Sequence, residues 1–396
     1  MAETRYANVT FKSQHAGILR EDPAGGTSFD YAEGFSSDIA CSLPASQRTH
    51  RVRFGLIPFF AHLAPEGWLR ARQSEFAEVD RADDFGILLS FGADCIGAVG
   101  VEDPTDSAAK VELHHGDALQ KAGIALERTI SGVQAKILCV QKGAKYRPAA
   151  ETGPAPLIAK YASEDLPDMV ANEEITLELC RILFGRDEVV TATRGFVEGV
   201  QRPALIVERF DRTGKTKEEK LRCEDFAQVI AQPPGRDLRG KYEAGYDAVA
   251  RALSHSAAPL IDAQKVFERL VGFVLVGNVD CHLKNWSLLE TPEGLRLSPV
   301  YDALNAYIYG AEGYSTRFGL LIDGERQQWE QYDRALLLRI AAELGLAERA
   351  ATATLTRLKR REAAFRARLN QPLGLSEERT WAYRQSVEQA WNRIYG

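Results

Sequence analysis

A mostly apolar segment that ends at a glycine and runs into a polar loop constrains the fold of this chain most. Residues 266–276 carry a nearly continuous apolar pattern, which predicts a buried helix, and Gly277 favours the end of that helix. The loop that follows, residues 278–285, holds Asp280 and Asn285. The sequence therefore predicts a polar site at the end of a buried helix.

A hairpin is expected directly after this loop. Residues 286–289 and 295–297 have the composition of short strands, and the Thr-Pro-Glu-Gly sequence at 291–294 is typical of a turn. Asn285 and Asp302 would then bracket the hairpin on one side.

The spacing of these three polar residues indicates phosphoryl transfer. An aspartate, an asparagine five positions later and a second aspartate beyond a short loop follow the order in which kinases present a base and two Mg²⁺ ligands. Asp280 suits the carboxylate that orients the attacking hydroxyl, and Asn285 and Asp302 suit the hard oxygen ligands that hold Mg²⁺ against a triphosphate. The alternative is a capped loop whose Asn and Asp only bond the backbone, and the spacing alone leaves both open.

Two upstream segments carry groups that could hold phosphates. The small-residue loop 129–136 precedes the apolar run 137–140, so its backbone amides could reach phosphates from the start of a strand, although it lacks the pattern of a P-loop. The run 157–161 predicts a strand with a single lysine, Lys160, where a kinase holds the lysine that neutralises phosphates. A solvent-facing strand lysine is the alternative.

A helix is expected after Lys160. It opens near Asn172, ends at Gly185 and carries Glu173, which could pair with Lys160. Residues 203–212 then have the pattern of a strand that leads into a connector. The order of loop, strand lysine, helix glutamate, hinge strand and polar loop is hard to obtain by chance. The expected buried face of the helix is formed by Ile175, Leu179, Ile182 and Leu183.

Together these motifs resemble the HipA-like serine/threonine kinases, which are toxins of bacterial type II toxin–antitoxin modules. The resemblance covers nearly the whole chain. It rests on the segments 59–67, 85–89, 92–98, 131–136, 207–212, 223–226, 241–243, 280–285 and 301–302.

The resemblance implies a two-lobed, protein-kinase-like α+β fold. Residues 1–105 would form a small N-terminal α+β subdomain, 106–212 a kinase N-lobe with the nucleotide loop, strand lysine and hinge, and 213–396 a mainly helical C-lobe with the catalytic loop. In this last part the sequence pattern predicts helices at 328–344, 347–369 and 377–394.

ATP and Mg²⁺ are the cofactors that the resemblance implies. Asp280 would be the catalytic base, Lys160, Asn285 and Asp302 would complete the catalytic set, and Asn285 and Asp302 would bind the metal. The ATP site would be lined by Ser131, Gly132, Val133, Gln134, Ala135, Lys136, Lys160, Glu208, Arg209, Phe210, His282, Leu283, Lys284, Asn285, Tyr301 and Asp302.

Two further residues of the predicted catalytic loop, His282 and Lys284, have chemistry that suits a role near Asp280. For His282 we favour a positioning and hydrogen-bonding role over that of a base, because Asp280 already fills the base position. Lys284 could neutralise the γ-phosphate or only pair with Asp280.

In the family, a serine just before the nucleotide loop is autophosphorylated, which ejects the loop and silences the enzyme. In this chain Thr129 takes the place of the usual first serine and Ser131 that of the second, and either could accept the phosphate. The alternative is that both hydroxyls only cap the turn before the strand.

Charge and cysteine content limit the partners. With 49 Lys and Arg against 55 Asp and Glu, the chain of 396 residues has a net charge of −6, so DNA would be contacted only indirectly through a basic partner. The resemblance implies a helix-turn-helix antitoxin of the HipB type and a protein substrate, in the family typically an aminoacyl-tRNA synthetase. Six scattered cysteines and the lack of a long apolar run predict reduced thiols in a cytoplasmic protein outside any membrane.

Three function classes follow. The first is an active toxin-type protein kinase, the second a kinase-fold enzyme that phosphorylates a small molecule or lipid, and the third a catalytically silent partner of an antitoxin. The intact set of Lys160, Asp280, Asn285 and Asp302 argues against the third class.

Overall fold

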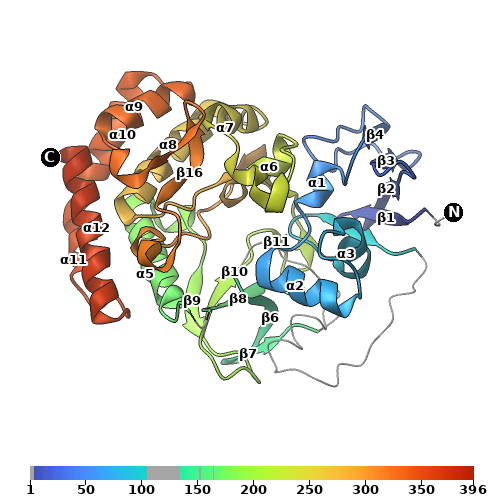
Figure 1. Ribbon diagram of the computed structural model, residues 1–396, viewed down its shortest axis with the longest axis horizontal. Helices are drawn as coiled ribbons and strands as arrows, with labels where there is room; N and C mark the ends of the chain where they lie inside the picture. The colour runs from blue at the N-terminus through green and yellow to red at the C-terminus, as the bar shows by residue number, and fades with distance from the viewer. Residues whose placement is uncertain (1–3, 105–133, 151–152, 164) are drawn as a thin grey trace. The chain divides into compact units, whose positions relative to one another are not determined.

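The computed structural model describes residues 4–104, 134–150, 153–163 and 165–396 (Figure 1). The chain forms two compact units, one from residues 1–161 and 195–234 and the other from 162–194 and 235–396. Helices and sheets are mixed in an α+β fold, as expected. The three-part division at residues 105 and 212 remains a prediction. No helix in the described parts of the chain has both the length and the apolar composition needed to cross a membrane.

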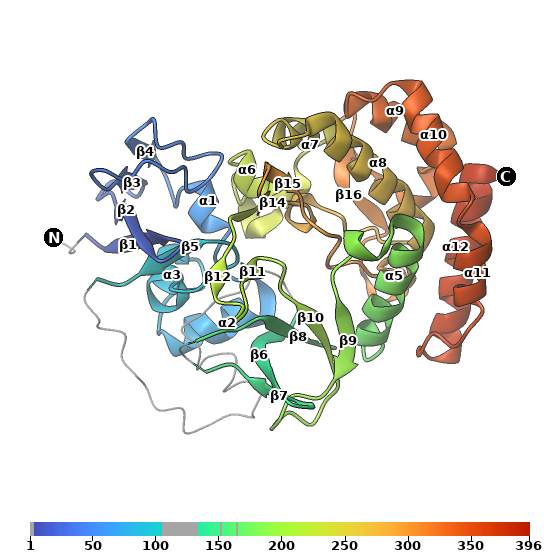
Figure 2. The same ribbon diagram turned by 180° about the vertical axis from the view of Figure 1, so that it is seen from behind.

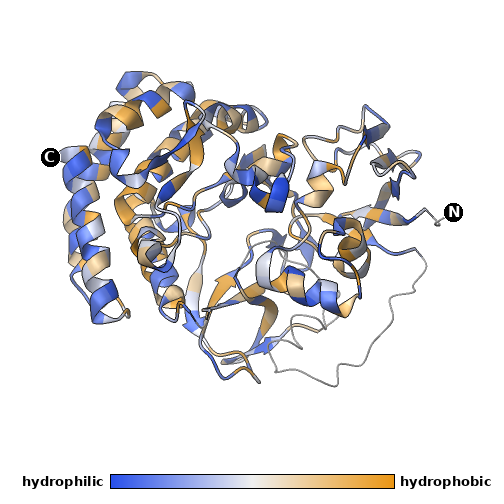
Figure 3. Cartoon of the chain, viewed as in Figure 1, coloured by the Kyte–Doolittle hydropathy of each residue, from blue (hydrophilic) through white to orange (hydrophobic). Residues whose placement is uncertain are grey.

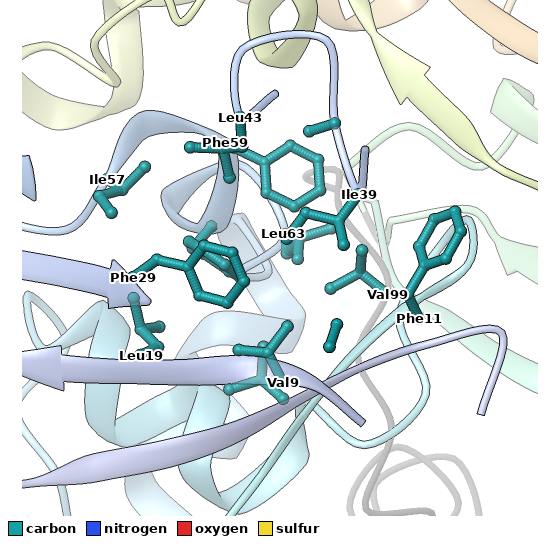
Figure 4. Packing of buried hydrophobic residues seen from close by; sticks show 14 of the residues in the cluster. Val9, Phe11, Leu19, Phe29, Ile39, Leu43, Ile57, Phe59, Leu63 and Val99 are labelled. Atoms are coloured by element: carbon teal, nitrogen blue, oxygen red, sulfur yellow. The ribbon is translucent and has the colours of Figure 1, made fainter. Parts of the chain in front are cut away.

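The first unit begins with a five-stranded antiparallel sheet in the order β4-β3-β2-β1-β5. Side chains of β1 alternate between buried and partly exposed, which is the period-two pattern of a sheet with one face on a core. Figure 4 shows this core, in which Val9, Leu19 and Phe29 of the sheet meet Phe59 and Leu63. The elements are β1 (Tyr6–Phe11), β2 (Gln14–Glu21), β3 (Thr27–Tyr31), β4 (Thr49–Val52), α1 (Pro58–Ala61), α2 (Gly67–Phe76), α3 (Asp84–Phe91) and β5 (Val99–Glu102).

A second antiparallel sheet of the first unit has the neighbours β7-β6-β8-β10. The strand predicted at 157–161 is present with those bounds, and the apolar run 137–140 lies inside β6. Leu69 of α2 packs with Leu138 of β6, so the helix covers part of this sheet. The elements are β6 (Lys136–Lys142), β7 (Lys145–Pro148), β8 (Leu157–Tyr161), β10 (Ala204–Glu208), β11 (Arg212–Thr213), β12 (Glu219–Lys220), β13 (Cys223–Asp225) and α6 (Phe226–Val229), with β9 (Ala192–Gly195) where the chain enters this unit.

The second unit is mainly helical and is built around α8, which packs against α5, α7, α9, α10 and α12 (Figure 2). Helix α5 is largely hydrophobic in Figure 3, whereas α11 and α12 carry many hydrophilic positions. The helices are α5 (Met169–Phe184), α7 (Tyr246–Leu253), α8 (Pro259–Val276), α9 (Arg334–Glu343), α10 (Glu348–Lys359), α11 (Glu362–Leu369) and α12 (Glu377–Tyr395). The strands and 3₁₀ turns are η1 (Arg186–Glu188), η2 (Arg236–Tyr242), η3 (Leu283–Asn285), β14 (Ser287–Thr291), β15 (Gly294–Leu297), η4 (Tyr307–Glu312), β16 (Arg317–Ile322), β17 (Glu325–Gln328) and η5 (Trp329–Gln331).

Most of the predicted helices of this unit are confirmed, but the single helix predicted at 347–369 is two helices, α10 and α11, separated by a turn at residues 360–361. Helix α8 ends at Gly277, whose φ of +71° lies in the left-handed region that glycine adopts without strain. The helix predicted at 328–344 begins later, because Asp333 caps the first turn of α9 through a hydrogen bond to Leu336 N. The residues before Asp333 form the end of β17 and the turn η5. Ile182 in α5 is only partly buried, unlike the other three apolar positions of its expected face.

Candidate active site

Asn285 closes the polar loop after α8. Its side-chain amide donates a 2.6 Å hydrogen bond to the Asp280 carbonyl oxygen, and its backbone N–H donates to His282 O at 2.9 Å. A carbonyl oxygen can only accept, so the amide nitrogen of Asn285 must face it. The carboxamide oxygen of Asn285 is then directed to other partners, which is what a metal ligand requires.

The Asp280 carboxylate has a defined hydrogen-bond partner. The Tyr242 hydroxyl, at the end of η2, donates to Asp280 Oδ1 over 2.8 Å. The Tyr242 ring also meets the His282 ring edge-on, with 4.9 Å between centroids. In the sequence Tyr242 stands out only as part of the motif 241–243, because the 38 positions between it and Asp280 leave no local signal of this bond.

Strand β16 packs closely against the backbone of the loop 278–285. A Cβ atom at Gly319 would lie 2.6 Å from His282 N and 2.7 Å from Cys281 C, so only glycine lets the loop approach the strand this closely. Cys281 is fully buried, and this burial raises the pKa of its thiol. The thiol is therefore protonated and unreactive, as expected for a spectator. All six cysteines of the chain are free, and five of them are buried.

Tyr301 fixes the far side of the β14–β15 hairpin, which is present as predicted. The Tyr301 hydroxyl donates to Lys284 O at 2.8 Å and therefore accepts from the Ser287 hydroxyl at 2.6 Å. Asp302, the next residue, has a φ of +55°, a left-handed conformation that aspartate adopts more easily than most residues. One hydrogen bond thus joins Asn285 to Asp280 and another joins Tyr301 to Lys284, so the residue before Asp302 is bonded to the polar loop.

In the first unit, Lys136 and Lys160 stand directly opposite each other on the antiparallel strands β6 and β8. Opposed residues of an antiparallel pair point to the same face of the sheet. Both lysines are buried, with 6% and 7% of their surface exposed. This arrangement concentrates positive charge on one face, which suits a polyanionic ligand.

The side chains of the predicted hinge, residues 208–210, lie in different environments. Glu208 at the end of β10 forms an exposed ion pair with Lys217, with 3.2 Å between Oε1 and Nζ. The Arg209 guanidinium is instead buried against Asp211 at 2.8 Å and donates to the Cys95 carbonyl at 3.2 Å. Its side chain is therefore part of the internal framework of the first unit. Phe210, which lies between Arg209 and Asp211 in the sequence, is partly buried.

Other predicted site residues differ in how far they are described. Gln134 Nε2 donates to Tyr161 O at 3.0 Å, which ties the start of β6 to the end of β8. Leu283 is completely buried, so its side chain belongs to the core of the second unit. Thr129 and the loop 131–133 lie outside the described residues. The expected pair of Lys160 with Glu173 stays a prediction.

The residues present fit a magnesium ion that is shared with a nucleotide. Among the described residues there is no group of three or more His, Cys, Asp or Glu side chains that could enclose a metal. Mg²⁺ in kinases, however, takes only one or two protein ligands and completes its shell with phosphates and water. The amide nitrogen of Asn285 is bonded to the Asp280 carbonyl, so its carboxamide oxygen is the atom that could serve as such a ligand.

Comparisons with known proteins identify the family of the chain. A family model described as the HipA-like C-terminal domain matches residues 128–365, and the HipA N-terminal domain matches residues 7–102. The Sinorhizobium fredii protein named "Putative kinase Y4dM" is 33% identical over 66% of this chain and 65% of its own length. The serine/threonine-protein kinase toxin HipA of Shewanella oneidensis is 24% identical over 76% of this chain and 74% of its own length.

The fold is also that of a solved structure. The chain superposes with a TM-score of 0.74 on a structure from the complex of Shewanella oneidensis HipA, HipB and operator DNA. The match has 20% identity and covers 98% of this chain and 96% of the other.

Proposed function

This chain belongs to the HipA-like family, and we propose that it is an ATP-dependent serine/threonine protein kinase that acts as the toxin of a type II toxin–antitoxin module. One arrangement carries the proposal. Asn285 bonds the Asp280 carbonyl, while Tyr301, the chain neighbour of Asp302, bonds the Lys284 carbonyl. Asp280 and Asn285 thus lie on one hydrogen-bonded loop, and the residue before Asp302 is bonded to the same loop, which supports a base and two oxygen ligands for phosphoryl transfer.

Each residue has a proposed task in the reaction. Asp280 orients the acceptor hydroxyl and takes its proton. Asn285 and Asp302 would hold Mg²⁺, which supplies charge neutralisation at the β- and γ-phosphates. Lys136 and Lys160, opposite each other in the sheet, neutralise the phosphate tail. Positioning and electrostatics together then account for catalysis, because the transferred phosphoryl group needs little covalent help.

The proposed partners follow from the relatives and from charge. The solved neighbour is a HipA in complex with HipB and operator DNA, which supports an antitoxin of the HipB type for this chain. The net charge of −6 suits a basic partner that carries the DNA contacts. We propose a cytoplasmic protein substrate, an aminoacyl-tRNA synthetase by analogy, and autophosphorylation at Thr129 or Ser131.

Controlled expression in the native host tests the toxin function. Wild-type chain should arrest growth, Asp280→Asn should not, and co-expression of a helix-turn-helix protein that co-purifies with the chain should restore growth. Phosphoproteomics of the arrested cells would identify the substrate. Growth that is equal for wild type and Asp280→Asn would contradict the toxin role. Phosphate found only on a lipid or small molecule would favour that alternative class of kinase.

A further inference from the structure

Two side chains with no role assigned from the sequence are connected to the Asp280 carboxylate, one directly and the other through the first. The first is Tyr242, whose hydroxyl donates to Asp280 Oδ1 at 2.8 Å. The second is Arg326 of β17, whose guanidinium carbon lies 4.7 Å from the centroid of the Tyr242 ring. The turn η2, which carries Tyr242, packs against both β16 and η3.

Arg326 is held in place by hydrogen bonds to the backbone. Its Nε donates to Phe318 O at 2.6 Å, and a terminal nitrogen donates to Arg317 O at 2.7 Å. Two backbone carbonyls of β16 therefore fix the plane of the guanidinium. A cation fixed over an aromatic face attracts that face, which holds the Tyr242 ring in one orientation.

The Asp280 carboxylate needs such a constraint. The last torsion of an aspartate side chain has a broad energy profile, so an unconstrained carboxylate presents either oxygen over a wide range of angles. A bond from Tyr242 to Oδ1 reserves that oxygen and directs Oδ2 to the remaining partner. For a base, this partner is the acceptor hydroxyl.

We propose that Tyr242 is a positioning residue that fixes the Asp280 carboxylate with Oδ2 toward the acceptor hydroxyl, and that Arg326 positions the Tyr242 ring. The inference rests on the proposed kinase function. The pair acts on the turnover step, because neither residue belongs to the groups proposed to hold the nucleotide. Loss of the Tyr242 hydroxyl should therefore lower kcat and leave KM for ATP unchanged.

The first test compares two tyrosine-to-phenylalanine variants. Tyr242→Phe removes one hydroxyl and keeps the ring, so kcat should fall on the order of tenfold, the loss expected for a hydrogen bond to a charged group. Tyr307→Phe is the matched control, because the Tyr307 hydroxyl also donates to a carboxylate, Glu330 Oε1, at 2.7 Å. This control should keep wild-type kcat.

The second test uses Arg326 in a double-mutant cycle. Arg326→Lys keeps a cation near the ring and should lower kcat less than Arg326→Gln does. If Arg326 acts through the Tyr242 hydroxyl, Arg326→Gln should cost much less in the Tyr242→Phe background than in wild type. Additive losses would contradict this coupling, and the Arg326 series decides the question if Tyr242→Phe fails to fold.

Two controls separate this inference from the proposed function. Wild type must transfer phosphate and Asp280→Asn must not. If both conditions hold while Tyr242→Phe keeps wild-type kcat, the positioning role is wrong and the kinase function stands. A rise in KM for ATP with unchanged kcat would place Tyr242 in nucleotide binding and would also overturn the inference. Absence of transfer in wild type would overturn both.

Discussion

The Asn285 side-chain amide is bonded to the Asp280 backbone carbonyl at 2.6 Å, so the proposed metal ligand also holds the proposed base in place. The two functions use different atoms of one carboxamide. The nitrogen braces the loop, and the oxygen remains for Mg²⁺. An asparagine supplies both a donor and an acceptor, whereas a carboxylate supplies only acceptors.

Asn285→Asp should therefore inactivate the enzyme, although a carboxylate is in general a good Mg²⁺ ligand. An oxygen would face the Asp280 carbonyl at a distance where two acceptors repel. We expect kcat/KM to fall at least a hundredfold, on the order of 3 kcal/mol in transition-state stabilisation. Steady-state kinetics measures this loss, with Asn392→Asp on the exposed surface of α12 as a control for the added charge. If Asn285→Asp kept its activity, the hydrogen bond from the Asn285 amide to Asp280 would not be needed, and Asn285 would act only as a metal ligand.

Asp302→Ala should weaken the binding of Mg-ATP more than that of nucleotide without metal. Removal of a carboxylate ligand leaves the phosphate charge poorly compensated when Mg²⁺ is present. Isothermal titration calorimetry with ATP, once with Mg²⁺ and once with EDTA, measures the affinity for Mg-ATP and for metal-free ATP separately. Asp302→Asn controls for the backbone, because asparagine also tolerates the φ of +55° at this position. Equal Mg-ATP affinity in wild type and Asp302→Ala would make Asp302 a structural loop residue.

Asp211 should contribute to stability in a pH-dependent way. Burial opposes the ionisation of Asp211, but Arg209 and Arg212, with the Gly97 N–H, outweigh burial and lower the pKa of its carboxyl. A lowered pKa in the folded state means that the unfolded state binds a proton first as pH falls. The contribution of Asp211 to the free energy of unfolding is thus present above the unfolded-state pKa of about 3.9. It is lost as the pH falls through the lower pKa of the folded state.

Asp211→Asn should accordingly destabilise the chain by about 3–5 kcal/mol at neutral pH, because the buried Arg209 loses its ion pair with Asp211 and Arg212 keeps only its pair with Asp94. The gap in melting temperature between wild type and variant should narrow below about pH 4. Asp237→Asn is the control, since its carboxylate is 81% exposed and 3.8 Å from Arg236. A gap that is constant with pH would show that the ionised form of Asp211 is not what stabilises the fold.

Phosphorylation at Thr129 or Ser131 should empty the nucleotide site. A phosphate adds about −1.5 to −2 charges at neutral pH and would compete with ATP for Lys136 and the loop amides. After prolonged incubation with Mg-ATP, wild type should gain mass and lose ATP affinity, while the Thr129→Ala, Ser131→Ala double variant should keep its affinity. Added phosphate without loss of affinity would contradict this regulation, and the single variants show which hydroxyl is modified.

Local patterns predicted the elements that carry the site. The strand around Lys160 and the helix that ends at Gly277 were both correct, because each depends on a short apolar run and a terminal signal. The opposition of Lys136 and Lys160 could not be predicted, since the register of a strand pair depends on both strands and their connection. The inward side chain of Arg209 was equally hidden, because its partner Cys95 O is 114 residues away.

Long-range contacts also explain why the sequence did not predict the residues around Asp280, the proposed catalytic base. Tyr242, 38 positions before Asp280, bonds its carboxylate, and Arg326, 46 positions after Asp280, contacts the Tyr242 ring. Only the folded chain brings these three side chains together.

The role of Asp280 as the catalytic base is tested by intact-mass analysis of purified wild type and Asp280→Asn, each incubated with Mg-ATP and a candidate protein substrate. Nucleotide binding should be measured by calorimetry on the same samples. Wild type should add phosphoryl groups to protein serine or threonine, while Asp280→Asn should bind Mg-ATP with similar affinity and add none. Equal phosphorylation by the two proteins would contradict the assignment of Asp280 as the catalytic base.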